Sequence, residues 1–273
     1  MTGTLCALAA IALWATLASL GVALGHVPPF LLTGLALLIG SVPSWPLARS
    51  WRIPASTLLL GIYGLFGYHC LLFVALRSAP PLEANLVNYL WPLLIVVLAP
   101  LVLPGIRLRP VHVVAAVAGF IGAALAIVGG QRIADELSWG YLAAAGSAFV
   151  WATYSLGTRR VAAFPTAAIG LFGLVSGLLA LACHALLEPA VALSARDWLL
   201  IAVVGLGPLG AAFFLWDAAL KRSDPRRVGL VSYLTPLAST LLLAATTGRP
   251  LTAWLVAAAL LIVGAALVGL RTR

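Results

Sequence analysis

The sequence has 273 residues, of which 63% are hydrophobic and 8% are charged, and its net charge is +9. Soluble domains average about 45–50% apolar and about 25% charged residues, so this composition excludes a soluble globular protein and predicts an integral membrane protein. The basic residues are spread in small groups beside apolar stretches, which excludes a separate nucleic-acid-binding module.

The apolar stretches predict ten membrane-spanning helices joined by short loops. A spanning helix needs about 20 apolar residues, and these stretches are apolar on every face, unlike the alternating strands of a membrane β-barrel. The first stretch has neither a basic leader nor a cleavage site, so we expect a retained helix rather than a signal peptide. The expected spans are 3–24, 30–48, 56–76, 84–103, 111–130, 138–157, 166–187, 198–220, 228–247 and 251–270.

The basic residues also predict the orientation, because short cytoplasmic loops retain positive charge. If the N-terminus is cytoplasmic, twelve of the sixteen Lys and Arg residues fall on the cytoplasmic side. We therefore expect both termini in the cytoplasm and a multi-pass protein of the inner (plasma) membrane. The four remaining basic residues are Arg77, Arg132, Arg196 and Arg249.

The chain contains an internal repeat. LVNYLWPL begins at residue 86 and LVSYLTPL at residue 230, a separation of 144; IGAAL at 121 and VGAAL at 263, and WAT at 14 and 151, follow the same order. A repeat of this length holds five spans, so the second copy enters the bilayer upside down. Residues 1–131 and 138–273 are the expected units. Inverted repeats are typical of secondary transporters, which bind substrate between the two halves.

The sequence resembles the drug/metabolite transporter superfamily, in particular its ten-helix EamA-type exporters. The resemblance rests on the two WAT segments, on ALRSAPPLEANLVNYLWPL at 75–93 and on ALKRSDP at 219–225. The second of these is most similar to the aromatic amino-acid exporter branch. The resemblance implies a central cavity lined mainly by the first, third, fourth, sixth, eighth and ninth spans, and export of small metabolites from the cytoplasm.

The fourth and ninth spans carry polar residues on one helical face. Asn85, Asn88 and Tyr89 share a face in the fourth span, and Ser232 and Tyr233 occupy matching positions in the ninth. Polar side chains are costly in hydrocarbon, so these faces are expected to point into the protein or a wet cavity. Two interpretations remain open: substrate binding, and hydrogen bonding that joins helices.

Each of these spans also contains a proline, Pro92 or Pro236. A proline in mid-span removes a backbone donor and kinks the helix. Both positions are therefore candidate hinges of a gate, although static kinks are also common in membrane helices.

Aromatic residues predict a ring-lined site. Trp14 and Trp151 are repeat mates, Trp91 lies deep in the fourth span, and Tyr154 and Ser155 share a face with Trp151. These rings are candidates for packing against an apolar or aromatic substrate side chain. Interfacial anchoring is the alternative, and we favour it for the tryptophans at span ends, namely Trp45, Trp51, Trp139, Trp198 and Trp254.

Tyr68 and His69 lie near the middle of the third span. A neutral imidazole offers one donor and one acceptor, so His69 is a candidate ligand for a carboxylate or an amine, and it permits proton coupling without requiring it. A packing role is the alternative.

These features lead to one central hypothesis. Asp217 is the one acidic residue expected within a span, and it lies near a boundary, so the cavity should suit a zwitterion: an aromatic or other apolar amino acid. The runner-up is export of threonine-type amino acids, other metabolites, drugs or quaternary cations; a passive pore is another class. The sequence lacks the nucleophile, carboxylate-pair and metal motifs of an enzyme, and we expect no cofactor, metal or nucleic-acid partner. The oligomeric state is not predicted.

Overall fold

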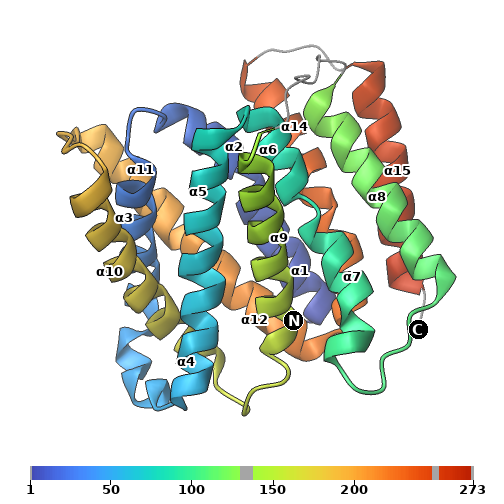
Figure 1. Cartoon of the computed structure of the whole chain (residues 1–273), viewed down its shortest axis with the longest axis horizontal. Helices are drawn as coiled ribbons and strands as arrows, with labels where there is room; N and C mark the ends of the chain where they lie inside the picture. Colours follow the sequence, from blue (N-terminus) through green and yellow to red (C-terminus); the bar gives the residue numbers. More distant parts are fainter. Residues whose placement is uncertain (1, 130–137, 248–251, 272–273) are drawn as a thin grey trace.

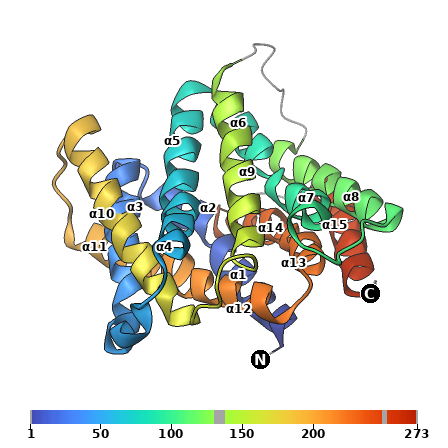
Figure 2. The ribbon, with the colours of Figure 1, turned by 60° about the horizontal axis from the view of Figure 1, so that its bottom comes forward.

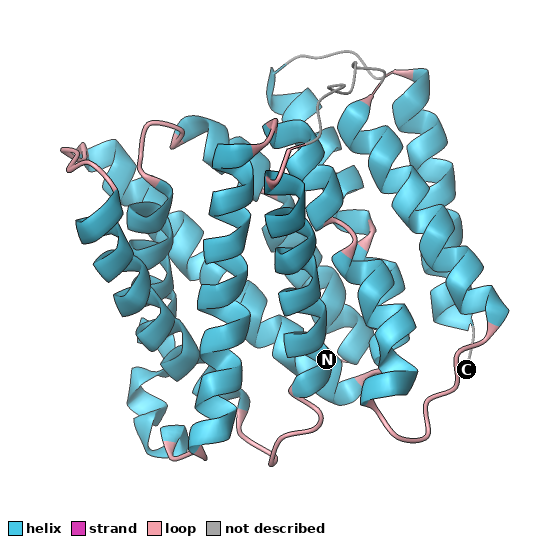
Figure 3. Ribbon diagram, in the orientation of Figure 1, coloured by secondary structure: helices cyan, strands magenta, loops and turns pink. Residues whose placement is uncertain are grey.

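The structure is a computed structural model that describes residues 2–129, 138–247 and 252–271. In these residues it consists of helices joined by loops and contains no β-strand (Figure 3). Nine helical segments of the described chain are long and apolar enough to cross a membrane. The expected loop charges that lie outside the described residues are Arg132, Asp135, Glu136 and Arg249.

The first half of the chain contains eight α-helices and two irregular segments, a 3₁₀ segment η1 and a π-helical segment η2. In chain order they are α1 (Gly3–Ala15), α2 (Leu17–Ala23), α3 (Pro29–Ser41), η1 (Val42–Trp51), α4 (Ala55–Ile62), η2 (Tyr63–Gly67), α5 (Tyr68–Ser78), α6 (Pro81–Asn88), α7 (Trp91–Val102) and α8 (Pro110–Val128).

The second half contains seven α-helices, a 3₁₀ segment η3 and a second π-helical segment η4. In chain order they are α9 (Gly140–Gly157), η3 (Thr166–Ala168), α10 (Ile169–Leu187), α11 (Ala195–Leu206), η4 (Gly207–Ala211), α12 (Ala212–Arg222), α13 (Pro225–Ser232), α14 (Leu234–Thr247) and α15 (Ala253–Arg271).

Helix α9 matches the expected span 138–157, but it is not among the nine apolar segments. It has 18 residues, and small and polar side chains such as Ser147, Tyr154 and Ser155 make it less apolar than the other spans. These three side chains are buried, so this part of the polar surface of α9 faces the protein interior.

Three consecutive elements of the first half recur in the second half at a constant spacing. The π-helical segments η2 and η4 begin and end 144 residues apart, and so do α5 and α12, and α6 and α13. LVNYLWPL and LVSYLTPL have the same separation. Backbone irregularities therefore recur together with the sequence motif.

Each proline motif interrupts its helix. Pro92 lacks an N–H, and its ring excludes a helical hydrogen bond to the carbonyl four residues earlier, that of Asn88; Pro236 has the same effect at Ser232. Helix α6 ends at Asn88 and α13 ends at Ser232. The expected kinks are present as helix interruptions, and motion at them stays a prediction.

The helices form a broad bundle (Figures 1 and 2). Helices α3, α10 and α11 lie on one side, α7, α8 and α15 lie on the other, and α1, α5, α9 and α12 lie between them. Helix α8 packs along α15, and α3 packs along α10. The start of α1 and the end of α15 are at the same end of the bundle (Figure 1), which we call the termini end.

Glycines allow α3 to approach the α11–η4 segment closely. A Cβ atom added to Gly40 would lie 2.7 Å from the carbonyl oxygen of Gly205 and 2.8 Å from the Cα of Gly210. Both contacts are with backbone, which cannot move aside as a flexible side chain can. Because each glycine has only a hydrogen atom in place of a side chain, the backbones of α3 and of the α11–η4 segment can approach this closely.

A buried carboxylate joins three helices at the opposite end of the bundle. Glu188, just after α10, accepts hydrogen bonds from the backbone N–H groups of Phe30 and Leu31 in the first turn of α3. Its oxygens also lie 2.7 Å from a guanidinium nitrogen of Arg77 at the end of α5 and 3.0 Å from Nδ1 of His184. A negative charge at a helix N-terminus is stabilising.

Candidate substrate cavity

A cavity of about 650 Å³ lies inside the bundle. Its walls come mainly from α2, α5 and α6, with contributions from α1, α3, α7, α9, the α11–α12 segment and α14. It extends to Val22 near the end of α2, Leu76 near the end of α5 and Pro81 at the start of α6. The cavity therefore opens away from the termini end (Figure 1).

Eight of the twelve residues predicted to bind substrate line this cavity. The third span contributes two of them, the fourth span contributes four, and the WAT segments contribute one each. They are Trp14, Tyr68, His69, Asn85, Asn88, Tyr89, Trp91 and Trp151.

The tryptophans meet in a buried cluster of four, consisting of Trp14, Trp91, Trp151 and Trp216. The ring centroids of Trp14 and Trp151 are 5.8 Å apart at an interplanar angle of 76°, and those of Trp14 and Trp216 are 5.2 Å apart. Trp151 and Trp216 stack at 6.1 Å, and Trp91 and Trp216 meet edge to face at 5.5 Å. The four rings pack against one another, and Trp14, Trp91 and Trp151 also line the cavity.

Hydrogen bonds fix two of these rings. The indole N–H of Trp14 donates to the carbonyl of Pro208, in the π-helical segment η4, at 3.0 Å. The indole N–H of Trp216 donates to the Ser155 hydroxyl, also at 3.0 Å. Buried indoles generally need such a partner. Ser155 thus orients Trp216 within the tryptophan cluster by a hydrogen bond and does not itself line the cavity.

His69 is oriented by the other π-helical segment. Its Nδ1 lies 2.6 Å from the carbonyl oxygen of Leu65 in η2. A carbonyl only accepts, so Nδ1 carries the proton, and in the neutral ring Nε2 is left as an acceptor. In this tautomer the two ligands expected for His69 are not equivalent, and substrate binding by His69 stays a prediction. Its free ring nitrogen suits an amine donor rather than a carboxylate.

Asn88 connects the cavity wall to α9. The Ser147 hydroxyl donates to Asn88 Oδ1 at 2.8 Å, and Asn88 Nδ2 donates to the hydroxyl oxygen of Tyr68 at 3.2 Å. Asn88 therefore joins helices by hydrogen bonds, which was one of the two alternatives, and it also lines the cavity; substrate binding by Asn88 stays a prediction. Because the Tyr68 oxygen accepts from Asn88, its own O–H is directed elsewhere.

The four remaining predicted residues lie outside the cavity lining. The Tyr154 ring packs at a tilt beside Trp151 with a centroid distance of 5.3 Å, and the Ser155 hydroxyl accepts from Trp216. The Ser232 hydroxyl donates to the Val228 carbonyl at 2.6 Å. None of these side chains lines the cavity; Tyr154 and Ser232 contact residues of their own helices, and Ser155 contacts Trp216 of α12.

Tyr233 occupies a different environment from its repeat mate Tyr89. The Tyr233 side chain is fully buried and packs against α8 and α15, where a Cβ atom on Gly119 would lie 2.4 Å from its ring. Tyr89 lines the cavity instead. Tyr89 and Tyr233 therefore occupy equivalent positions in the two motifs but have different surroundings.

The cavity and cluster residues that were not predicted from the sequence include Phe213, Trp216, Thr235 and Ser239. Phe213 and Trp216 lie one turn apart on α12, and their rings contact the tryptophan cluster. Thr235 and Ser239 lie one turn apart on α14 and line the cavity. An aromatic pair and a hydroxyl pair at helical spacing are weak signals, and they become meaningful only once the inward face of each helix is known.

The termini end of the bundle is closed by polar contacts. Lys221 Nζ lies 2.6 Å from Asp217 Oδ2, donates to the carbonyl of Phe164 at 2.8 Å and sits 3.8 Å from the centre of the Phe164 ring. Thr166 also donates to Asp217 Oδ2 at 2.6 Å. The Lys221–Asp217 ion pair and its neighbours therefore fasten α12 to the segment before α10.

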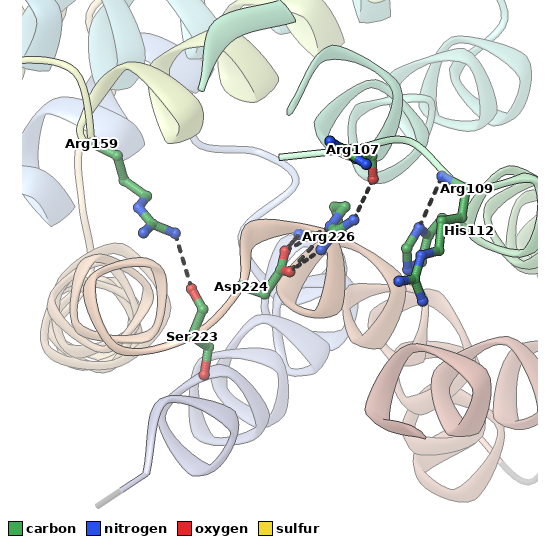
Figure 4. A network of polar contacts seen from close by, with 7 residues as sticks. All are labelled: Arg107, Arg109, His112, Arg159, Ser223, Asp224 and Arg226. Carbon is green, nitrogen blue, oxygen red and sulfur yellow. Dashed lines mark hydrogen bonds and ion pairs between the residues drawn. The ribbon is translucent and has the colours of Figure 1, made fainter. Parts of the chain in front are cut away.

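A second set of contacts lies nearby (Figure 4). Arg226 binds Asp224 and donates to the carbonyl of Arg107, while Arg159 donates to the carbonyl of Ser223 at 3.3 Å. Partial burial alone raises the pKa of Asp224, but hydrogen bonds from Arg226 outweigh it and hold that pKa below its ordinary value. These contacts thus join three loops at the termini end of the bundle.

The sequence profile of the EamA-like transporter family matches residues 1–128 and 138–270 of this chain. The aromatic amino acid exporter YddG of Ancylobacter novellus is 44% identical over 283 residues, which cover all of this chain and 98% of that protein. The protein of the same name from Escherichia coli is 30% identical and covers 97% of this chain and 95% of its own length.

A solved crystal structure covers 98% of this chain and 96% of its own chain, with 43% sequence identity and a TM-score of 0.92. Both the sequence matches and this structural match extend over essentially the whole chain. The profile matches two separate stretches that together span nearly all of the sequence. The protein therefore belongs to the EamA-like transporter family.

Proposed function

We propose that this protein exports aromatic and other apolar amino acids by alternating access through the central cavity. The observation that carries the proposal is the composition of the cavity wall. Tryptophan rings form one side, and Tyr68, His69 and Asn88 form a polar strip beside them. No charged side chain lines the cavity in the described part of the chain. The YddG relatives carry names that agree with such a substrate.

The polar strip matches the two ends of a zwitterion. The Nε2 atom of His69 accepts a hydrogen bond and suits the substrate ammonium. The O–H of Tyr68 donates and suits the carboxylate, and the two rings are in contact at a centroid distance of 5.0 Å. Ammonium and carboxylate lie on one carbon of an amino acid, so an adjacent acceptor and donor are what they require. The tryptophan cluster then receives the side chain.

The same composition disfavours the other substrate classes. A quaternary cation has no carboxylate to pair with in the cavity wall, and a threonine-sized side chain would leave much of an apolar cavity of about 650 Å³ unfilled. A passive pore would need a continuous path, whereas the tryptophan cluster and the polar contacts below it lie across the termini end.

We further propose ten spans in two inverted five-helix units, residues 1–131 and 138–273, with both termini in the cytoplasm. The two profile matches and the recurrence of three elements 144 residues apart support the duplication. The basic residues of the termini end, including Arg107, Arg159 and Arg226, support the orientation. In this orientation the cavity faces outward and its cytoplasmic side is closed, as after release of substrate.

The test is uptake of labelled phenylalanine and tryptophan into liposomes that contain the purified protein. We expect saturable uptake that unlabelled aromatic amino acid inside the vesicles accelerates, with little competition from threonine, glutamate or a lipophilic cation. An imposed proton gradient will show whether transport is coupled to protons. Absence of saturable aromatic uptake, with threonine or the cation carried instead, would overturn the substrate assignment.

Three substitutions test the site itself. Asn88→Ala, Tyr89→Ala and Trp151→Ala should each lower uptake at equal protein density in the membrane. Trp254→Ala is the matched control, because Trp254 is 52% exposed at the start of α15 and outside the cavity lining. Wild-type uptake by all three cavity variants would refute the site.

A further inference from the structure

Among the described residues that line the cavity, Thr235 has a buried side-chain oxygen that makes no hydrogen bond. Its side chain is 5% exposed, and its Oγ1 has no hydrogen-bond partner among the described residues. Other polar cavity atoms are engaged, such as Nδ1 of His69 and the amide of Asn88. A buried hydroxyl without a partner is unfavourable, and a polar ligand group at the right place would remove that penalty.

The helix interruption explains why this hydroxyl is unsatisfied. A helical Ser or Thr usually donates to the carbonyl three or four residues earlier, as Thr16, Thr158 and Ser232 do here. Thr235 lies in the first turn of α14, so the carbonyls three and four residues earlier are those of Ser232 and Val231 in α13, on the far side of the break. The break separates the hydroxyl from its ordinary partner.

The internal repeat makes this position distinctive. In LVNYLWPL the residue before the proline is Trp91, whose ring joins the tryptophan cluster. In LVSYLTPL the same position is Thr235, a smaller side chain that lines the cavity and whose hydroxyl oxygen is buried. One half of the protein therefore fills this position with a ring, while the other places a hydroxyl-bearing side chain in the cavity wall. Ser239 lies one turn further along α14 and also lines the cavity.

We propose that Thr235 determines specificity among aromatic substrates by hydrogen bonding to the indole N–H of tryptophan or the phenol O–H of tyrosine. The inference rests on the proposed function, because it assumes that Tyr68 and His69 on α5 hold the amino acid head group. The side chain then extends toward the other walls, which include α14. A threonine oxygen has two lone pairs and accepts from either donor. Phenylalanine has no polar atom to offer.

The test compares tryptophan and phenylalanine uptake by each variant in the same liposomes. In Thr235→Val the shape is retained and the hydroxyl is lost, so we expect the ratio of kcat/KM for tryptophan to that for phenylalanine to fall about 2- to 12-fold, the range for loss of one neutral hydrogen bond. Thr235→Ser should restore the ratio. Because both substrates are measured in one preparation, the amount of folded protein cancels.

Two further measurements make the result specific. Thr240→Val is the matched control, since Thr240 lies on the same helix, donates to the Ala126 carbonyl at 3.3 Å and is outside the cavity lining; its ratio should equal that of the wild type. In competition assays, methylation of the indole nitrogen should weaken tryptophan binding to the wild type but not to Thr235→Val.

The outcomes separate this inference from the proposed function. An unchanged ratio in Thr235→Val, or an equal loss for phenylalanine and tryptophan, would overturn the role of Thr235 and leave aromatic export intact. Wild-type protein that carries no aromatic amino acid would overturn both. A selective loss for tryptophan and tyrosine in Thr235→Val, with the wild-type ratio retained in Thr235→Ser, would establish the role of the hydroxyl.

Discussion

Removing one member of the Asp217–Lys221 pair should have an effect that depends strongly on which member is removed. The Asp217 side chain is 1% exposed, whereas that of Lys221 is 27% exposed. Lys221→Met leaves a buried carboxylate with the Thr166 hydroxyl as its remaining partner. Asp217→Asn leaves an ammonium group that still donates to the Phe164 carbonyl and can reach water.

The magnitudes follow from this asymmetry. Leaving one charge of a buried pair uncompensated costs about 3–5 kcal/mol, which lowers Tm by roughly 6–20 °C at about 2–4 °C per kcal/mol. Asp217→Asn exchanges charged for neutral hydrogen bonds, and we expect a loss of about 1–3 kcal/mol. Replacing both residues, as in Asp217→Leu combined with Lys221→Met, removes the buried charge and should be more stable than Lys221→Met alone.

Thermal unfolding of the detergent-solubilised protein, followed by intrinsic fluorescence, measures these differences. Arg196→Met is the control, because Arg196 is an exposed cation at the start of α11 and its loss should leave Tm nearly unchanged. If Lys221→Met is as stable as Asp217→Asn, or if the double variant is the least stable of the three, the assignment of an uncompensated buried carboxylate is wrong.

Two further predictions concern helix contacts. Gly40→Ala should lower stability by about 1–3 kcal/mol because the added methyl group meets the backbone of Gly205. Gly264→Ala is the control and should be neutral or stabilising, because the space around its Cβ position is open. Equal Tm values for the two variants would contradict the close approach. Glu188→Ala should lower stability by about 1–3 kcal/mol because two backbone N–H groups and Arg77 lose their acceptor. Glu188→Gln should lower stability less. The thermal unfolding assay measures both variants, and equal losses of stability would contradict the hydrogen bonds described.

The sequence predicted the cavity wall best where polar residues interrupt an apolar span. Asn85, Asn88 and Tyr89 stand out because each has a cost in hydrocarbon that only an inward orientation avoids. Proline likewise indicates a helix interruption by its own chemistry, and both interruptions occur where expected. The element boundaries agree with the expected spans to within a few residues at most ends.

The remaining cavity residues could not be predicted because the sequence does not show which face of each helix points inward. Helices α10 and α15 are apolar all round, so periodicity cannot distinguish a lipid-facing from a protein-facing side. Phe213 and Trp216 were missed because an apolar span gives the same ambiguity on α12. Tyr233 shows the reverse effect, since the motif that places Tyr89 in the cavity places Tyr233 against Gly119. The π-helical segments have no sequence signature of their own and appear only in the backbone.

The distribution of the nine tryptophans has a spectroscopic consequence. Four are buried and packed together at the cavity wall, while Trp45, Trp139, Trp198 and Trp254 are about half exposed. The two groups should emit at different wavelengths, and excitation energy should pass readily among indoles whose centroids are 5.2–6.5 Å apart. A solute entering the cavity would alter the short-wavelength emission alone, so the protein contains its own optical probe of occupancy.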